Sequence, residues 1–200
     1  KHGGGIAGFS KVSGGFKTIN QLIQTPKVFQ HGATHSQVDG RVQSIEDAPQ
    51  GGKYIYVEGQ KHYVPHGHDV TIKPGQEVEA GDIMSDGLPN PAEIVKHKGI
   101  GEGRRYFVDT MADIYKNSKI TAERRNLELL SRGLINHVRM TQEHNHFVPD
   151  DVRPYSYLEW HYEPREGHKN LEPKAARNMY LERPYLHYSI GTKVRPSVIK

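Results

Sequence analysis

The chain has 200 residues, of which 34% are hydrophobic and 8% aromatic, a lean supply of core-forming side chains. The formal net charge of +4 permits contact with nucleic acid without requiring it. The 21 glycines and 12 prolines, in a chain this polar, indicate that neighbouring subunits supply part of the burial. Because cysteine is absent, disulfides and thiolate metal sites are excluded, as fits a reducing cytoplasm. No apolar run approaches membrane-spanning length and no signal peptide is visible, so we expect a cytoplasmic protein without membrane contact.

Residues 1–29 are predicted to form a glycine-rich loop and then a short helix that Pro26 ends. His2 lies at one edge of the loop, and an imidazole there can donate or accept a proton near neutral pH. Glycines would let this group swing into a site and out again; they are Gly3, Gly4, Gly5, Gly8, Gly14 and Gly15. The helix would carry one apolar stripe, made of Phe16, Ile19 and Ile23. The first residue is not Met, so we expect the chain to start within something larger.

Residues 30–88 are predicted to be β structure, because short runs of β-forming residues alternate with turn residues. The expected strand segments are 38–45, 53–57, 62–64, 70–72 and 77–79. The stretch 70–84 turns at Pro74-Gly75 and has the rhythm of a barrel-sandwich hybrid. Lipoyl and biotinyl carriers share this rhythm but present a modifiable Lys beside Met. This sequence has no such pair, so the rhythm indicates architecture.

Residues 89–140 are predicted to be helical. Asn90, Pro91 and Glu93 form a helix-start signature for a short helix that stops near Gly99. A second helix is expected over 102–117, with a buried face made of Phe107, Met111 and Ile114. A third would be capped by Thr121 and would align Leu127, Leu130 and Leu134.

Residues 141–200 are predicted to be an extended segment that wraps another surface, because prolines interrupt it and aromatic residues are mixed with charges. Residues 185–190 resemble a strand, and the end is basic, with Lys193, Arg195 and Lys200. The expected fold class is therefore α+β: a loop and helix, a β-rich barrel-sandwich-like region, a helical region and an extended C-terminal segment.

Most chemical motifs have a structural explanation. The glycine run lacks the Gly-Lys-Ser/Thr ending of a phosphate-binding loop. Two histidine pairs, His66/His68 and His144/His146, have no third ligand at convincing spacing. Carboxylates on the helical segments have nearby arginines at salt-bridge spacing, which is typical of a solvated face. No Asp-x-Asp-x-Asp cluster that would hold catalytic magnesium is present.

Several segments together resemble, in order, the C-terminal part of the largest (beta-prime) subunit of bacterial-type multisubunit DNA-directed RNA polymerase. Residues 2–8 and 15–19 are similar to that family's trigger loop, His-Thr-Gly-Gly-Val-Ala-Gly followed by Gly-Leu-Pro-Arg-Val. The strand at 38–42, the segment 75–87 and the stretch 90–115 resemble later motifs of the family. Ile190-Gly191-Thr192-Lys193 is similar to the start of a switch segment near template DNA.

The chain also departs from that family. Lys17 and Thr18 replace its Pro-Arg, and Ile190-Gly191 reverses its Gly-Ile. The first trigger helix, the bridge helix and the magnesium-binding Asp loop are absent, and residues 141–189 have no clear counterpart. A divergent phage-encoded enzyme with split subunits, or an ordered fragment of a longer chain, would each account for this.

The resemblance implies a subunit that is inactive alone and that contributes the trigger loop to template-directed nucleotide addition. Residues 1–29 would then be the trigger-loop remainder and second trigger helix, 30–88 a jaw-like region, 89–140 a helical region and 141–200 an extended segment with a switch-like end. His2 would approach the phosphates of the incoming NTP, and Lys193 and Arg195 would contact nucleic-acid phosphate.

The implied partners are beta-like and N-terminal beta-prime-like subunits, DNA template, nascent RNA and NTP. Mg²⁺ would be held by another subunit or by a missing part of the chain. The alternatives are a non-catalytic barrel-sandwich adaptor and a stand-alone nucleic-acid-binding protein.

Overall fold

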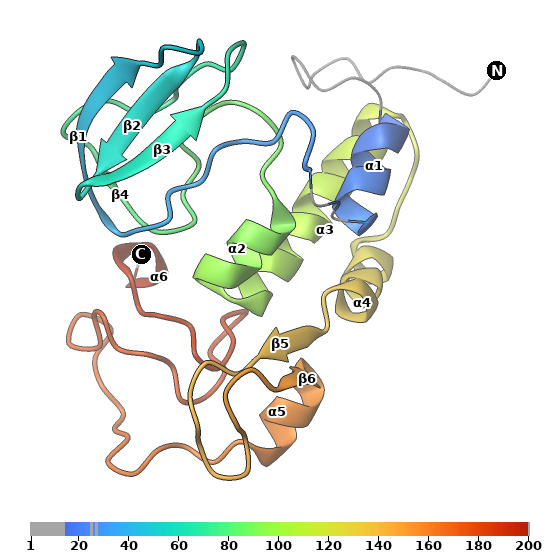
Figure 1. Cartoon of the computed structure of the whole chain (residues 1–200). Helices are drawn as coiled ribbons and strands as arrows, with labels where there is room; N and C mark the ends of the chain where they lie inside the picture. The colour runs from blue at the N-terminus through green and yellow to red at the C-terminus, as the bar shows by residue number, and fades with distance from the viewer. Residues whose placement is uncertain (1–14, 25, 27, 200) are drawn as a thin grey trace.

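The computed structural model describes residues 15–24, 26 and 28–199. Over these residues helices combine with antiparallel strands, which confirms the expected α+β class. A curled sheet lies beside a central group of helices, and a C-terminal part lies below them (Figure 1). None of the described helices is both long enough and apolar enough to span a membrane.

The sheet contains β1 (Gly40–Asp47), β2 (Lys53–Val57), β3 (Gln60–Val64) and β4 (Glu77–Val78), in the order β3-β2-β1-β4. Glu58 and Gly59 make the tight turn from β2 to β3, and both have the positive φ that such a two-residue turn requires. A register shift between Val42 and Ser44 interrupts the pairing of β1 with β2, and irregularities of this kind bend a strand. The segment expected to be a strand at 70–72 forms only a single bridge, between Val70 and Ser85.

One core fills the curled sheet, because alternate residues of its strands point to the same side. Its buried members are aliphatic or Met side chains: Val42, Ile55, Val57, Val64, Ile72, Val78 and Met84. This core is separate from the core of the helices, so the β region and the helical region each bury their own apolar residues.

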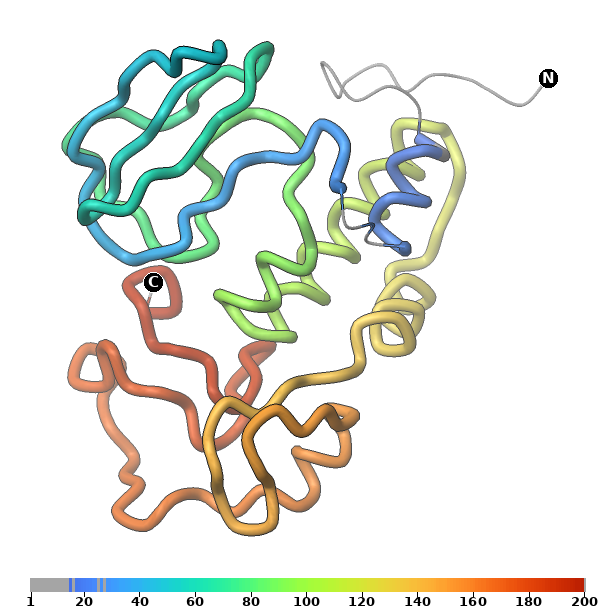
Figure 2. The backbone as a smooth tube through the Cα atoms, viewed as in Figure 1, coloured from blue at the N-terminus to red at the C-terminus, as the bar shows by residue number. Residues whose placement is uncertain are grey.

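Two helices follow the sheet, α2 (Pro91–Lys98) and α3 (Ile100–Asn117), with Gly99 between them at φ 89°. Asn90 caps α2 as predicted, accepting a hydrogen bond from the Ala92 N–H. The predicted buried face of α3 is confirmed, since Phe107, Met111 and Ile114 are each 1% exposed. Figure 2 shows the tube of α1 (Gly15–Gln24) lying next to α3, onto which it packs.

The buried face of α1 differs from the expected stripe. Leu22 and Thr18 are buried, Ile19 is partly buried, and Ile23 is 39% exposed. Contact with the α3 core therefore decides which side of α1 is buried, and this contact is tertiary, so the local apolar spacing did not predict it. The Phe16 side chain lies outside the described atoms.

The third helix, α4 (Arg124–Leu134), starts later than Thr121, and Glu123 stands at its cap position without a capping hydrogen bond. Its predicted stripe is only partly buried, because Leu127 is 5% exposed but Leu130 and Leu134 are 40% and 42% exposed. Small Ser131 occupies the buried position between them at 2% exposure.

The C-terminal part has more regular structure than the expected extended segment. β5 (His137–Arg139) lies at the end of the region 89–140 that was expected to be helical, so that prediction is wrong there. It pairs antiparallel with β6 (Val152–Pro154), and α5 (Tyr155–His161) follows directly. No strand forms at 185–190; Tyr185 and Tyr188 instead close a tight turn through two reciprocal backbone hydrogen bonds. The chain then returns to the sheet and ends near it with the short α6 (Pro196–Ile199) (Figure 1).

Candidate functional site

The N-terminal candidates lie almost entirely outside the described residues: His2, Gly3, Gly4, Gly5, Gly8 and Gly14. Gly15 is described and is the buried first residue of α1. The geometry of the predicted trigger loop therefore stays a prediction, and only the helix that follows it can be placed.

That helix is fixed to the body of the molecule. Leu22 packs into the core that Leu88 and Phe107 also enter. The Gln21 Nε2 donates a hydrogen bond to the Gln30 carbonyl at 2.6 Å, which ties α1 to the segment after it. A loop preceding α1 would thus be attached to a firmly packed helix.

The basic C-terminal candidates converge on one carboxylate. Lys193 Nζ donates to one oxygen of Asp39 at 2.8 Å, and Arg195 Nε donates to the other at 2.7 Å. Arg195 also donates to the His97 carbonyl at 2.7 Å. This group of Asp39, Lys193 and Arg195, here called the Asp39 junction, joins the C-terminal stretch to the residue just before β1 and to the end of α2.

The charges of the Asp39 junction compensate one another. Burial raises the pKa of the Asp39 carboxyl, but hydrogen bonds from Lys193, the Ala80 N–H and Arg195 outweigh it and lower the pKa to about 2. The Arg195 side chain is only 11% exposed, against 26% for Lys193. Arg195 is therefore mainly an internal link, while Lys193 keeps more access to solvent. Contact of either side chain with nucleic-acid phosphate stays a prediction.

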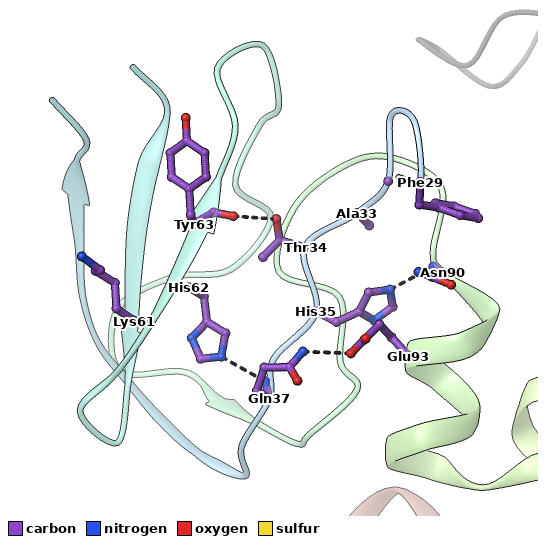
Figure 3. Close-up of a pocket in the computed structure, with 11 residues that line it drawn as sticks. Phe29, Ala33, Thr34, His35, Gln37, Lys61, His62, Tyr63, Asn90 and Glu93 are labelled. Carbon is purple, nitrogen blue, oxygen red and sulfur yellow. Dashed lines mark hydrogen bonds between the residues drawn. The ribbon is translucent and has the colours of Figure 1, made fainter. Parts of the chain in front are cut away.

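A pocket of about 360 Å³ lies between β3, the segment 29–37 and the start of α2. Figure 3 shows His35, Gln37 and Glu93 meeting on one side of it, with His62 and Lys61 on the other. The pocket is therefore where the sheet, the connecting segment and α2 come together.

Hydrogen bonds of two residues, His35 and Gln37, fix the sheet, the connecting segment and α2 relative to one another. His35 is buried, its Nε2 accepts from the Asn90 N–H at 3.0 Å, and its Nδ1 faces the Gly81 carbonyl at 2.9 Å. These partners fit only the neutral ring with the proton on Nδ1. Gln37 donates from Nε2 to Glu93 at 2.9 Å and from its N–H to His62 Nε2 at 3.0 Å.

The helix-start signature of Asn90, Pro91 and Glu93 therefore makes only part of the contacts that a capping box would make. Glu93 does not return to the Asn90 N–H, because His35 accepts from that group. Burial raises the pKa of Glu93, but Gln37, Lys96 and His97 together lower it. Glu93 is a charged structural link of the pocket wall.

His62 is the unusual member of the pocket. It is 5% exposed, and its Nδ1 has no hydrogen-bond partner among the described residues. Burial lowers the pKa of His62, which nearby carbonyls of Ile55 and Gln60 partly offset. With Nε2 accepting from Gln37, the neutral ring holds its proton on Nδ1.

The histidine pairs do not form metal sites within the described part of the chain, where no three His, Asp or Glu side chains gather closely enough to hold an ion. His68 faces Asp86 at 3.0 Å, and His144 faces the Glu163 carbonyl at 2.6 Å. Both are engaged in local structure.

Sequence reasoning missed Asp39 and Gln37 as the groups that organise this region. Asp39 lies in the Val-Asp-Gly-Arg-Val segment, and the basic C-terminal end was a signal that an acidic partner exists. Asp39 and Lys193 are 154 residues apart in the sequence, so the sequence did not indicate which carboxylate is the partner of the basic end. No sequence signal marked Gln37.

Comparison with known proteins relates the chain to RNA polymerase. No family model matches it. It is 25% identical over 165 residues to the DNA-directed RNA polymerase subunit beta' of Natranaerobius thermophilus, a match that covers 80% of this chain and 13% of that subunit. It is 27% identical over 146 residues to the same subunit of Clostridioides difficile, which covers 70% of this chain and 12% of the subunit.

The match to the Syntrophobacter fumaroxidans subunit is 25% over 134 residues, or 65% of this chain and 10% of that protein. The chain thus spans only about a tenth of the length of the relatives it matches. The resemblance to beta-prime subunits is confirmed, and it concerns a small part of those subunits, at 25–27% identity.

Proposed function

We propose that this chain is part of a multisubunit DNA-dependent RNA polymerase, to which it contributes the trigger loop. The similarity to beta-prime subunits over 65–80% of the chain carries the proposal. Because the chain matches so small a part of those subunits, its proposed partners are beta-like and N-terminal beta-prime-like subunits. Nucleotide addition, with DNA template, nascent RNA and NTP, would take place only in the assembled cytoplasmic enzyme.

In the proposed reaction the RNA 3′-hydroxyl attacks the α-phosphate of the NTP and pyrophosphate leaves. His2 would lie near the β-phosphate when the loop closes, either donating a proton or placing a hydrogen-bond donor beside the leaving charge. The glycines around it favour the open loop, because ordering glycine costs more backbone entropy than ordering other residues. Contacts with a correctly paired NTP would offset that cost, so closure would depend on base pairing.

Two-metal assistance is the chemistry that bound Mg²⁺ supplies in such transfers. The described residues offer no set of three carboxylate or imidazole groups near one another for this ion. From the resemblance, we propose that Mg²⁺ is bound by another subunit or by a part of the protein beyond this sequence. Lys193 is the better candidate for a template phosphate, since Arg195 is almost covered within the Asp39 junction.

Replacing His2 in the assembled enzyme tests the proposal. We expect His2→Ala to slow single-nucleotide addition on the order of 100-fold without loss of assembly, because one group at the leaving phosphate is removed. His2→Gln keeps a hydrogen-bond donor that does not titrate near neutral pH. A rate near that of the unchanged enzyme would therefore indicate positioning, and a rate like that of His2→Ala would indicate proton donation.

The matched control is His66→Ala, which removes an exposed loop histidine far along the sequence. It should leave the rate of nucleotide addition unchanged. If His2→Ala also leaves that rate unchanged in a fully assembled enzyme, the role of His2 is refuted.

A further inference from the structure

A second and larger cavity, of about 620 Å³, lies between α3, α4, α5 and the turn at 184–189. Its walls carry four arginines, two from α3 and two from α4: Arg104, Arg105, Arg124 and Arg132. Two carboxylates, Glu128 and Glu159, also line it. Positive charge is therefore concentrated on its two helical walls.

Two of these arginines are already paired. Arg124 donates to Asp109 at 2.8 Å and to Glu128 at 3.0 Å, so Glu128 neutralises a charge of its own helix. Arg105 lies 3.5 Å from Glu102, one turn away on α3. Glu128 is thus not available to balance the remaining arginines.

The other two arginines have no ion pair among the described residues. Arg104 uses its Nε to donate to the Ile135 carbonyl at 2.8 Å, and its guanidinium lies 5.7 Å from the centre of the Tyr155 ring. The Arg132 side chain has neither a hydrogen bond nor an ion pair within the described residues, 15–24, 26 and 28–199. Burial lowers the pKa of Arg104 and the nearby charge of Arg132 lowers it further, a sign that the two cations repel each other.

The rest of the pocket lining could contact the uncharged part of a ligand as well as its charged group. Asn136 and the exposed Ser156 add polar groups near Tyr155, and Tyr188 with the 81% exposed Leu186 adds an aromatic and an apolar surface. A cavity of several hundred Å³ with a few convergent polar groups is typical of small-ligand sites. Guanidinium groups bind phosphate oxygens through paired hydrogen bonds.

We propose that this cavity, here called the arginine pocket, binds the phosphate groups of a nucleotide. Arg104 and Arg132 hold the phosphate, and Tyr188 and Leu186 offer a surface to the base. Glu159 weakens binding, because its carboxylate lies near Arg104 and repels an anion. The described lining comes from α3, α4, α5 and the turn at 184–189, and the inference goes beyond the polymerase proposal and does not depend on it.

Calorimetric titration of the full 200-residue chain tests the site. The probes are inorganic pyrophosphate, ATP and a short DNA duplex, with a chelator present so that no metal bridges ligand and protein. We expect Arg132→Gln to weaken binding about 10-fold or more, because one charged hydrogen-bonding group is lost. Glu159→Gln should strengthen binding, and added salt should weaken it.

Arg125→Gln is the matched control, since Arg125 is an exposed arginine of the same helix that does not line the pocket. Binding of pyrophosphate and ATP that depends on Arg132 but not on Arg125 supports a free nucleotide as the source of the phosphate. Binding of the duplex alone, with the same dependence on Arg132, supports a phosphate of nucleic acid. If no probe binds, or if Arg125→Gln weakens binding as much as Arg132→Gln, the proposal is overturned. Because catalysis is not measured, this failure leaves the polymerase proposal untouched.

Discussion

At the scale of single residues, Asp39 links parts of the chain that are far apart in sequence. It is the shared acceptor of Lys193 and Arg195, and it also accepts from the Ala80 N–H. Without its charge, no carboxylate of the junction would compensate the nearly covered Arg195, whose other acceptor is the neutral His97 carbonyl. Leaving a covered charge uncompensated is costly, so the Asp39 junction should matter for stability.

We therefore expect Asp39→Asn to reduce the free energy of unfolding at pH 7 by about 1–2 kcal/mol, measured by urea denaturation. The figure is kept low because the Asp39 side chain is 35% exposed and solvent screens part of the interaction. Since the pKa of Asp39 is lowered to about 2, its contribution is full above about pH 4 and is lost as the pH falls toward 2. The two proteins should converge in stability over that range.

The control for this substitution is Asp47→Asn. Asp47 also pairs with a lysine, Lys53, at 3.1 Å, but its side chain is 89% exposed. Exposed pairs of this kind contribute little, so the control should be close to the unchanged protein at every pH. Equal effects of the two substitutions would contradict the role given to Asp39.

At the scale of elements, glycine lets the C-terminal segment approach the helices closely. A Cβ added to Gly101, near the start of α3, would lie 1.6 Å from the His187 carbonyl oxygen. A Cβ at Gly99 would lie 2.8 Å from Thr192 Oγ1 and 2.9 Å from Ser189 Oγ. The segment 187–192 can therefore pack on the α2–α3 boundary only because side chains are missing there.

We expect Gly101→Ala to destabilise the protein by about 2 kcal/mol, because the cost of overpacking exceeds the gain of about 1 kcal/mol in helix propensity. Hydrogen exchange should show loss of protection in the segment 187–199. The control is Gly133→Ala in α4, where an added Cβ meets nothing within 4 Å, so the same chemical change should be neutral or stabilising. A stable Gly101→Ala protein with unchanged exchange would contradict this packing.

Sequence patterns of a few adjacent residues correctly predicted some of the strands and helix starts. β2 matches its expected bounds, and α2 has the cap that Asn90 and Pro91 indicated. The errors lie where tertiary contacts decide: α1 buries Leu22 instead of Ile23, and Thr121 does not cap α4. The β5–β6 hairpin went unpredicted because each strand has only three residues, too few for a periodic signal.

The candidate sites follow the same division. The motif around His2 stays a prediction from adjacent residues, because those residues lie outside the described ones. The Asp39 junction and the arginine pocket bring together groups from distant segments, so no local spacing in the sequence predicts them. A basic stretch indicates only that an anion is near, and for Arg195 the structure supplies that anion from within the chain.

At the scale of the whole molecule, the lean hydrophobic content is accompanied by large apolar side chains at the surface. Trp160 is 86% exposed, Leu186 81% and Leu129 72%. They lie on α5, on the 184–189 turn and on α4, so the exposure is concentrated in the second half of the chain. Singly exposed apolar residues occur on most soluble proteins, so the expectation of partners rests on the resemblance to beta-prime subunits, and these side chains offer a way to test it.

We therefore expect the chain, purified from its native source, to be found in a complex rather than alone. Its partners should be large subunits, one of which carries the Asp-x-Asp-x-Asp sequence that this chain lacks, and mass spectrometry of the purified complex would identify them. Trp160 is the single tryptophan, so its fluorescence reports on the surface of α5 directly. If a partner covers that helix, emission should shift to shorter wavelength on assembly, because the ring leaves water. A monodisperse, partnerless chain in its native source would rule out the polymerase assignment and favour a stand-alone binding protein or an adaptor.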